Sequence, residues 1–157
     1  MNIRRKIETG INDYVRTNRG QCLKTLKIID GHDNQVPEIP FLTGYCGHAP
    51  PHPDLGQECG AKLAQHVFHL KTQAEDEPRK KADNRIEELI GILSAPVDPH
   101  TEPGDGNKAF GKLVAALNAN EDLGLHVYDI YPSDDVNAFE GKNWHDQIVL
   151  SVVCQEV

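Results

Sequence analysis

The sequence predicts a single compact α+β domain over residues 1–157, in which helices pack against a mainly antiparallel sheet. Its length of 157 residues suits one domain. Segments with helical spacing and segments with strand patterning follow one another as helix, three strands, two helices and two strands. This order lacks the regular βαβ alternation of a parallel sheet. The chain also ends in an almost continuous apolar strand, which is typical of a central strand buried on both faces.

The first element is predicted as a helix over Met1–Asn18, because five apolar residues recur at helical spacing and make one stripe. They are Ile3, Ile7, Ile11, Tyr14 and Val15. A strand is predicted next over Cys22–Asp30, followed by a turn in "GHDNQ". The segment Val36–Cys46 is also strand-like but contains Pro37 and Pro40. Proline removes a ladder donor, so this segment is predicted as an edge strand or an extended arm.

The middle of the chain is predicted as a loop, a strand and a helix. Gly47–Gly60 has three prolines and three glycines in fourteen residues, and the whole Pro-, Gly-, Cys- and His-rich loop extends over about residues 46–61. Lys62–Thr72 is predicted as the next strand. A helix is then predicted over Arg79–Leu93, with one apolar face toward the core. That face consists of Ile86, Leu89, Ile90 and Leu93.

The last third is predicted as a loop over Ser94–Asn107, a short helix, and two strands. The helix has Phe110, Leu113, Val114 and Leu117 on its inward face. The first of the two strands runs from about Leu125 to Tyr131, and residues 136–143 connect it to the second. That second strand, "WHDQIVLSVVCQEV", is the apolar one and is expected to lie in the centre of the sheet.

Composition disfavours several classes of protein. The formal net charge of −8 argues against specific binding of nucleic acid, which needs lysine and arginine at the phosphates. No apolar run approaches the roughly 20 residues of a membrane span, so no membrane partner is expected. The N-terminal stretch "MNIRRKIETG" has no apolar segment after its basic residues, which argues against a secretory signal. The four cysteines are expected to stay reduced in a cytoplasm.

A zinc site is the sharpest chemical candidate, formed by Cys46, His48, His52 and Cys59. The interval between the two histidines fits zinc-binding patterns, but the Cys-x-His pair and the isolated Cys59 do not form a knuckle. His66 and His69 are expected on opposite faces of a strand and cannot share one ion. The favoured prediction is therefore no metal and no cofactor, and a zinc-stabilised module or a metal-dependent enzyme is kept as the alternative.

The patterns expected of an enzyme are incomplete. Cys22 and Cys154 lie in predicted strands and are expected in the core, whereas Cys46 or Cys59 is expected to be an exposed thiol. "PGDGNKAFGK" lacks the order of a phosphate-binding loop, and a helix cap at Asp105 or Asn107 explains it. The acidic cluster near the C-terminus matches no EF-hand, and its Ser-Asp-Asp step is typical of a turn. Its members are Asp134, Asp135, Glu140, His145 and Asp146. The chain is predicted not to be an enzyme.

The second half, from Lys62 to the end, carries a recognisable order of elements. A strand "HVFHLKT", a polar turn and a helix "RKKADNRIEELIGIL" come first. They are followed by "KLVAALNANEDLGLHVYDIYPSDD" and by the tryptophan-led strand "NWHDQIVLSVVCQEV". This order resembles the phage tail-terminator (tail-completion) proteins, including minor tail proteins of lambda-like phages and their Mu-like prophage relatives.

The resemblance implies a twisted sheet flanked by helices and a homo-oligomeric, hexameric ring that caps the tail tube. Such a ring ends polymerisation of the tail tube protein and provides the joint to a head-completion or connector protein. It implies no active site and no cofactor, and a location in the host cytoplasm during assembly and then in the virion tail. Another head–tail joining protein is left open as an alternative.

The long Cys/His/Pro-rich loop departs from the family pattern. Long loops often carry contacts to partners, so this loop is predicted as a contact arm toward a neighbouring subunit or a tail partner. A stiff, proline-rich segment also loses less entropy on docking. The interface candidates in it are His48, His52, Asp54 and Gln57.

Overall fold

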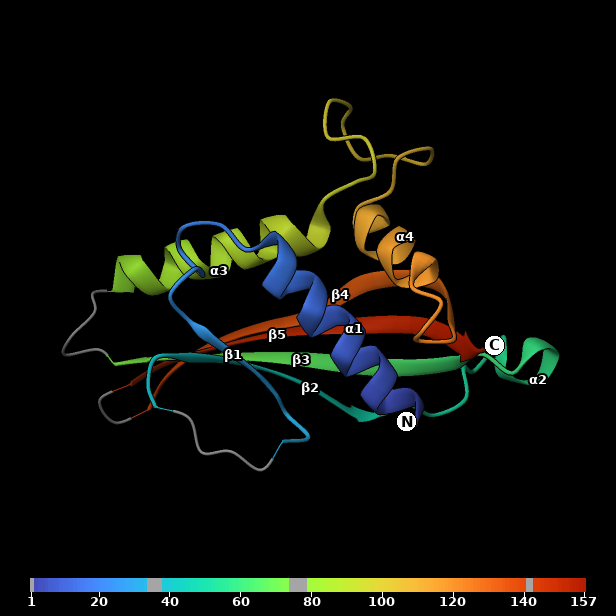
Figure 1. Cartoon of the computed structure of the whole chain (residues 1–157), viewed down its shortest axis with the longest axis horizontal. Coiled ribbons are helices and arrows are strands. Elements are labelled where there is room, and N and C mark those ends of the chain that lie inside the picture. The colour runs from blue at the N-terminus through green and yellow to red at the C-terminus, as the bar shows by residue number, and fades with distance from the viewer. Residues whose placement is uncertain (1, 34–37, 74–78, 141–142) are drawn as a thin grey trace.

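The computed structural model describes residues 2–33, 38–73, 79–140 and 143–157. These residues form four helices and five strands, and Figure 1 shows their arrangement. In chain order the elements are α1 (Ile3–Asn18), β1 (Lys27–Asp30), β2 (Phe41–His48), α2 (Gly56–Cys59), β3 (Lys62–Gln73), α3 (Arg79–Ser94), α4 (Gly111–Ala119), β4 (Leu125–Glu140) and β5 (Asn143–Glu156).

The five strands form one mixed sheet in the order β1-β2-β3-β5-β4. Strands β1 and β2 are parallel, and the other three pairs are antiparallel. The central pair of β3 and β5 runs in register along its length, from Lys62 opposite Cys154 to Gln73 opposite Asn143. The predicted α+β domain with a mainly antiparallel sheet and flanking helices is therefore confirmed.

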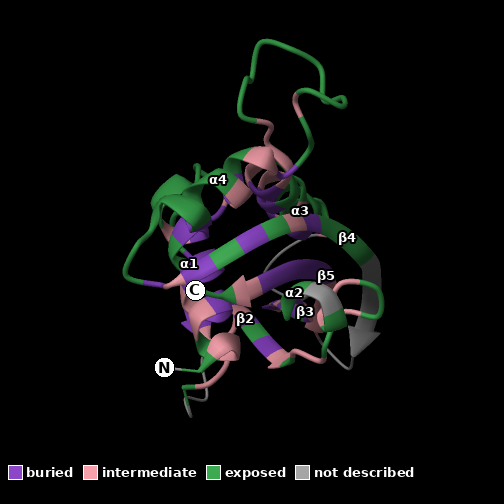
Figure 2. Ribbon diagram, turned by 90° about the vertical axis from the view of Figure 1, so that its right-hand side faces the viewer, coloured by how far each residue is buried: buried purple, intermediate pink, exposed green. Residues whose placement is uncertain are grey.

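Helices α1, α3 and α4 all lie on one face of the sheet, as Figure 1 shows. Alternate residues of β3 are accordingly buried beneath them, among them Phe68 and Leu70, each 1% exposed. The opposite face is here called the open face, and it carries Val67, His69, Val149 and Ser151. Strand β5 lies between β3 and β4 and, as predicted, is buried on both faces, because Val149 and Ser151 are also buried on the open face. Figure 2 shows the buried residues gathered between the sheet and the helices.

Helix α1 buries the stripe that its sequence predicts. Ile7, Ile11, Tyr14 and Val15 are all at most 8% exposed, and Ile3 packs at the edge of the core. Asn2 caps the helix, because its side-chain oxygen accepts a hydrogen bond from Arg5 N at 3.0 Å.

The predicted strand over Cys22–Asp30 is correct only for its last four residues. The preceding residues form a turn that a carboxylate from α3 organises. Glu88 accepts hydrogen bonds from the backbone N–H groups of Gly20 (3.2 Å), Cys22 (3.1 Å) and Leu23 (2.8 Å). These donors are therefore not available to a sheet ladder, and Cys22 is half-buried in the turn instead of in a core strand.

The prediction of an edge strand for Val36–Cys46 is wrong. Strand β2 lies between β1 and β3 and pairs with both. Pro40 precedes the first strand residue, Phe41, so its missing N–H falls outside the ladder. Pro37 lies outside the described residues.

The hairpin of β4 and β5 is longer than predicted. The segment 136–143 was expected to be a connection, but β4 continues to Glu140 and pairs there with Asn143. Two bulges interrupt the register, between Val127 and Asp129 and between Pro132 and Asp134. The bulges break the two-residue alternation that marks a strand, so "SDD" resembles a turn in sequence although it belongs to β4.

Helix α3 is rotated relative to the predicted face. Leu89 and Leu93 are buried at 1% exposure and Ile86 packs partly against the core, but Ile90 is 38% exposed. The prediction that Ile90 is a core residue is therefore wrong. The buried stripe runs instead through Ala82, Arg85, Leu89 and Leu93. Ile90 borders an apolar pocket of about 170 Å³ between α3 and the β4–β5 hairpin.

Helix α4 buries Leu113 and Leu117 as predicted, its N-cap residue Phe110 is also buried, and Val114 packs partly against the core. The predicted cap at Asp105 or Asn107 is wrong, since the helix begins after Phe110, which adopts a left-handed φ of 66°. Asn107 instead closes the preceding loop. Its Oδ1 accepts from Asp98 N at 3.0 Å, and its Nδ2 donates to Asp98 O at 2.9 Å.

Candidate functional site

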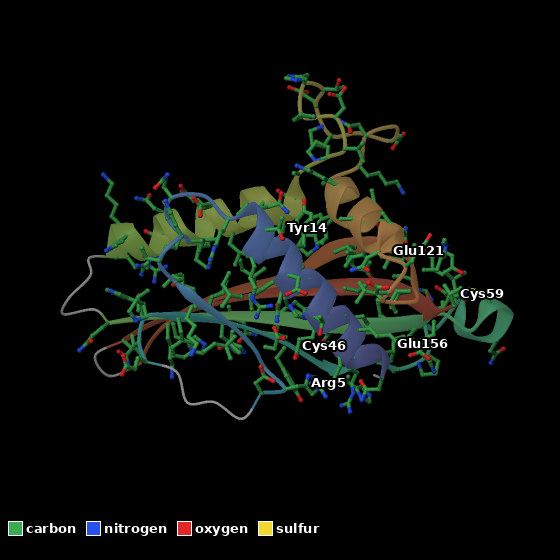
Figure 3. All side chains as sticks on the ribbon, in the orientation of Figure 1. Arg5, Tyr14, Cys46, Cys59, Glu121 and Glu156 are labelled. Carbon is green, nitrogen blue, oxygen red and sulfur yellow. The ribbon has the colours of Figure 1, made fainter. Side chains whose placement is uncertain are left out.

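The four alternative zinc ligands are divided between the core and one end of the sheet. Cys46 is fully buried in β2, and burial raises the pKa of its thiol to about 12. The exposed thiol expected at Cys46 or Cys59 is that of Cys59, in α2. Figure 3 shows these two cysteines well apart. His48 is exposed at the end of β2.

The other two candidate ligands, His52 and Cys59, each make local hydrogen bonds. His52 Nδ1 accepts from the backbone N–H groups of Asp54 (3.0 Å) and Leu55 (3.1 Å). Cys59 Sγ donates to Leu55 O at 3.2 Å. Within the described ranges, no group of three or more His, Cys, Asp or Glu side chains is placed to hold one metal ion. The structure therefore gives the zinc alternative no ligand cluster in this segment.

The segment predicted as a loop over Gly47–Gly60 is a folded excursion between β2 and β3, here called the projection (residues 49–61). Pro51 pairs with Lys62, and the strands continue past the main ladder through two further hydrogen bonds. His52 N donates to Ala61 O, and Leu63 N donates to Pro50 O, both at 2.8 Å. The short helix α2 then closes the turn beyond the end of the sheet (Figure 1).

Three of the four interface candidates are accessible on or beside this projection. His48, Asp54 and Gln57 are exposed, whereas His52 is half-buried because its ring caps the turn. The segment predicted as a contact arm is not extended, since its backbone folds back on itself. The segment still presents these polar side chains outward from a hydrogen-bonded base.

Chelation is expected to leave the melting temperature unchanged, and the protein purified without added metal is expected to contain no stoichiometric zinc. Cys46 already packs in the core, and His52 Nδ1 already holds the turn, so neither needs an ion to be ordered. Thermal unfolding with and without EDTA, together with elemental analysis, measures this. Unfolding on chelation, with one zinc per chain, would contradict it.

A buried polar network beneath α1 was not found by sequence reasoning. Asn12 is fully buried and lies at its centre. Its Nδ2 donates to Asp30 Oδ1 at 2.8 Å and to Gly44 O at 3.0 Å, and its Oδ1 accepts from His66 Nε2 at 3.0 Å. This one side chain therefore joins α1 to three strands of the sheet.

Glu8, one helical turn before Asn12, makes a second link to the sheet. It is 1% exposed, and its carboxylate accepts from Cys46 N at 3.0 Å and from His32 N at 3.1 Å. His32 Nδ1 lies 2.8 Å from Glu8 Oε1. The polar positions at i and i+4 beside the apolar stripe of α1 were the only signal in the sequence. Their partners come from distant segments.

His66 is the fully buried histidine of this network. It is 0% exposed, and desolvation lowers its pKa to about 3, although the charge of Asp30 acts in the opposite direction. Its Nδ1 has no hydrogen-bond partner, and its ring makes an edge contact with Phe68, with centroids 4.7 Å apart. A neutral imidazole sealed from water orders the helix–sheet contact. It is not placed to exchange protons with a substrate.

Acidification is expected to destabilise the protein through His66. The unfolded chain binds a proton near pH 6.5, whereas the folded chain does so only near pH 3, so stability falls as pH drops through this window. From pH 7 to pH 5 this group alone should remove about 2 kcal/mol from the free energy of unfolding. Urea titrations at both pH values measure the loss. His66→Gln, which keeps a donor toward Asn12, should flatten the pH dependence, and an unchanged slope would contradict the assignment.

The predicted acidic cluster near the C-terminus is split between the two faces of the sheet. Asp146 is 1% exposed beneath α3 and accepts a hydrogen bond from Arg79 at 2.5 Å. Arg79 also lies over the ring of Trp144, with its guanidinium carbon 5.2 Å from the ring centroid. His145 contacts His69 instead, on the open face. The side chains of Asp134, Asp135 and Glu140 lie outside the described residues.

Comparison with models of known protein families gives no match for this chain, and comparison with curated protein sequences gives none either. Among the helices of the described residues, none is both long and apolar enough to cross a membrane.

Proposed function

We propose that this chain is a structural assembly protein of a phage or prophage tail, a tail terminator. It forms a hexameric ring that caps the tail tube, ends the polymerisation of the tube protein and provides the joint to a head-completion or connector protein. The ring assembles in the host cytoplasm and remains in the virion. One support is the order of elements in the second half of the chain. Another is the single α+β domain, whose flanking helices agree with the architecture that this resemblance implies.

The observation that carries the proposal is the ordered projection at one end of the sheet. Its base is closed by two backbone hydrogen bonds of 2.8 Å, and its tip holds exposed Asp54 and Gln57. A segment that is ordered before docking loses less conformational entropy when it binds a neighbour. Its polar surface suits the rim of a subunit contact, where direct hydrogen bonds and water are common. The projection is therefore assigned to contacts between neighbouring copies in the ring.

The test removes the projection and keeps the sheet. Residues 53–60 are replaced by the dipeptide Asn-Gly, which suits a two-residue turn between His52 and Ala61. These two residues are already joined by a backbone hydrogen bond of 2.8 Å, so the shortened protein should fold as a monomer. We expect its solution mass to fall from that of a ring to that of one chain, and its capping of tail tubes to be lost.

A matched control removes eight residues elsewhere. Residues 99–106 are replaced by Gly-Gly between Asp98 and Asn107, which are also held together by hydrogen bonds. We expect this control to keep the ring mass and the control of tube length. The proposal fails if the protein without the projection still forms rings and still limits tube length. Equal loss of assembly in both shortened proteins would also remove the specific role of the projection.

A further inference from the structure

A groove lies between helices α1 and α4, on the side of the sheet that the helices cover. The two helices are in close contact at Gly10, where an added Cβ atom would lie 2.7 Å from Leu117 Cδ2. Beside this contact they leave a cavity of about 370 Å³. Figure 3 shows Tyr14 on the part of α1 that lies beside α4. The polar residues that line the cavity are Asp13, Tyr14, Thr17, Asn18, Lys112 and Asn120.

Tyr14 brings an unsatisfied hydroxyl group to this groove. The residue is 8% exposed, and within the described part of the chain its hydroxyl has no hydrogen-bond partner. Burial raises the pKa of this phenol, so the hydroxyl stays protonated near neutral pH and can donate a hydrogen bond. A polar group that is largely buried without a partner costs free energy, and an acceptor entering the groove would recover it.

Lys112 adds a positive charge from the other wall of the groove. Its side chain is exposed and makes no ion pair or hydrogen bond with another described residue. The carboxylate of Asp13, on the α1 wall, is already bound to Arg16 Nη1 at 2.6 Å. An ammonium group and a phenol hydroxyl are both donors, and the first is also charged. The groove therefore suits a carboxylate, which accepts from both.

We propose that this groove receives the carboxylate of Asp54 from the projection of a neighbouring copy. Asp54 is exposed, and its carboxylate has no partner among the described residues. The inference rests on the proposed ring and names the surface that the projection meets there. A ring of more than two copies joins unlike surfaces head to tail, so the projection must dock on a different part of its neighbour. Charge complementarity between Asp54 and Lys112 selects the groove as that part.

One chain carries the two halves of this contact on different sides. The projection lies beyond the end of the sheet, whereas the groove lies between two of the helices (Figure 1). The projection is also narrow, because its backbone turns back and joins His52 N to Ala61 O at 2.8 Å. Such a tip suits a groove at the small end of ligand-pocket volumes. The chain has a net charge of −8, so docking of a carboxylate needs a local cation such as Lys112.

Reversing the two charges tests the contact in the full chain. Lys112→Glu and Asp54→Lys each place like charges together. Each should raise the protein concentration at which half of the chains are in rings by about tenfold or more. The double variant restores the pair with its signs exchanged, so it should assemble within about threefold of the unaltered protein. Light scattering over a dilution series measures all four proteins.

Two further variants separate docking from folding. Tyr14→Phe removes only a hydroxyl that bonds to no described residue, so the melting temperature should stay unchanged while assembly weakens by about threefold or more. Lys108→Glu changes an exposed lysine that does not line the groove, so it should assemble as the unaltered protein does. Melting temperatures of all variants show which of them fold.

The outcomes distinguish this docking from the ring itself. Rings that tolerate both single charge reversals and Tyr14→Phe would overturn the docking and leave the ring standing. So would losses that the double variant does not recover, or an equal loss in the Lys108 control. An unaltered protein that stays a single chain at every concentration would contradict the ring, and the docking would fall with it.

Discussion

Replacing Gly44 with alanine is expected to remove about 4 kcal/mol from the free energy of unfolding. A Cβ atom at this position would lie 1.9 Å from Asn12 Oδ1 and 2.7 Å from its Cγ. The side chain of Asn12 cannot move away without losing buried hydrogen bonds, because its amide bonds to Asp30, Gly44 and His66. Either these buried groups lose their partner or α1 moves away from the sheet, and both outcomes are costly.

Urea unfolding followed by circular dichroism measures this loss, with Gly91→Ala as the matched control. Gly91 lies on the exposed side of α3, and an added Cβ atom there would meet nothing within 4 Å, so alanine should add about 0.5–1 kcal/mol of stability. The Asn12→Ala change should relieve the clash, so the double variant should lose less than the two single losses added together. A Gly44→Ala loss below about 0.5 kcal/mol would show that Asn12 does not occupy this position.

Truncating Leu89 to alanine is expected to cost about 2–5 kcal/mol. The side chain is 1% exposed within the main hydrophobic core, and its removal leaves a cavity between α3 and the sheet. Ile90, the next residue on the same helix, is 38% exposed and provides the control. Ile90→Ala should cost less than about 1 kcal/mol, because much of its surface already meets water. Equal losses at both positions would contradict the rotation of α3 that the structure shows.

The sequence was a good guide where one periodicity held over a whole element. Helix α1 has an unbroken apolar stripe, and β5 is apolar along most of its length, so both were predicted with the right burial. Helix α3 was predicted in the right place but with a shifted face. Ala82 is only weakly apolar and Arg85 is charged, so a pattern based on hydrophobicity does not assign either residue to the buried face.

The elements that were misjudged depend on contacts between distant segments. Glu88 of α3 accepts hydrogen bonds from the turn before β1, so that strand begins later in the sequence than predicted. The prolines near β2 suggested an edge, yet the described one, Pro40, precedes the ladder and leaves β2 free to pair on both sides. The bulges in β4 interrupt the two-residue alternation of the strand, so the sequence pattern did not identify its second half.

The candidate site depends even more on contacts between distant segments, which the sequence alone does not reveal. The Cys/His-rich segment was visible in the sequence, but whether its side chains converge depends on the fold, and they separate between core and surface. The network around Asn12 joins residues as many as 54 positions apart in the chain, Asn12 and His66. The facing pair His69 and His145 requires the register of β3 against β5, which no local pattern specifies.

Solution mass measured by multi-angle light scattering tests the central claim most directly. The tag-free chain, passed through a sizing column over a wide range of concentrations, should elute as one discrete species. The proposed hexameric ring predicts a mass close to six times the 17.4 kDa of one chain. The protein in which Asn-Gly replaces residues 53–60 should elute at the mass of one chain under the same conditions. A mass that stays at 17.4 kDa for the unaltered protein at every concentration would contradict a ring-forming assembly protein.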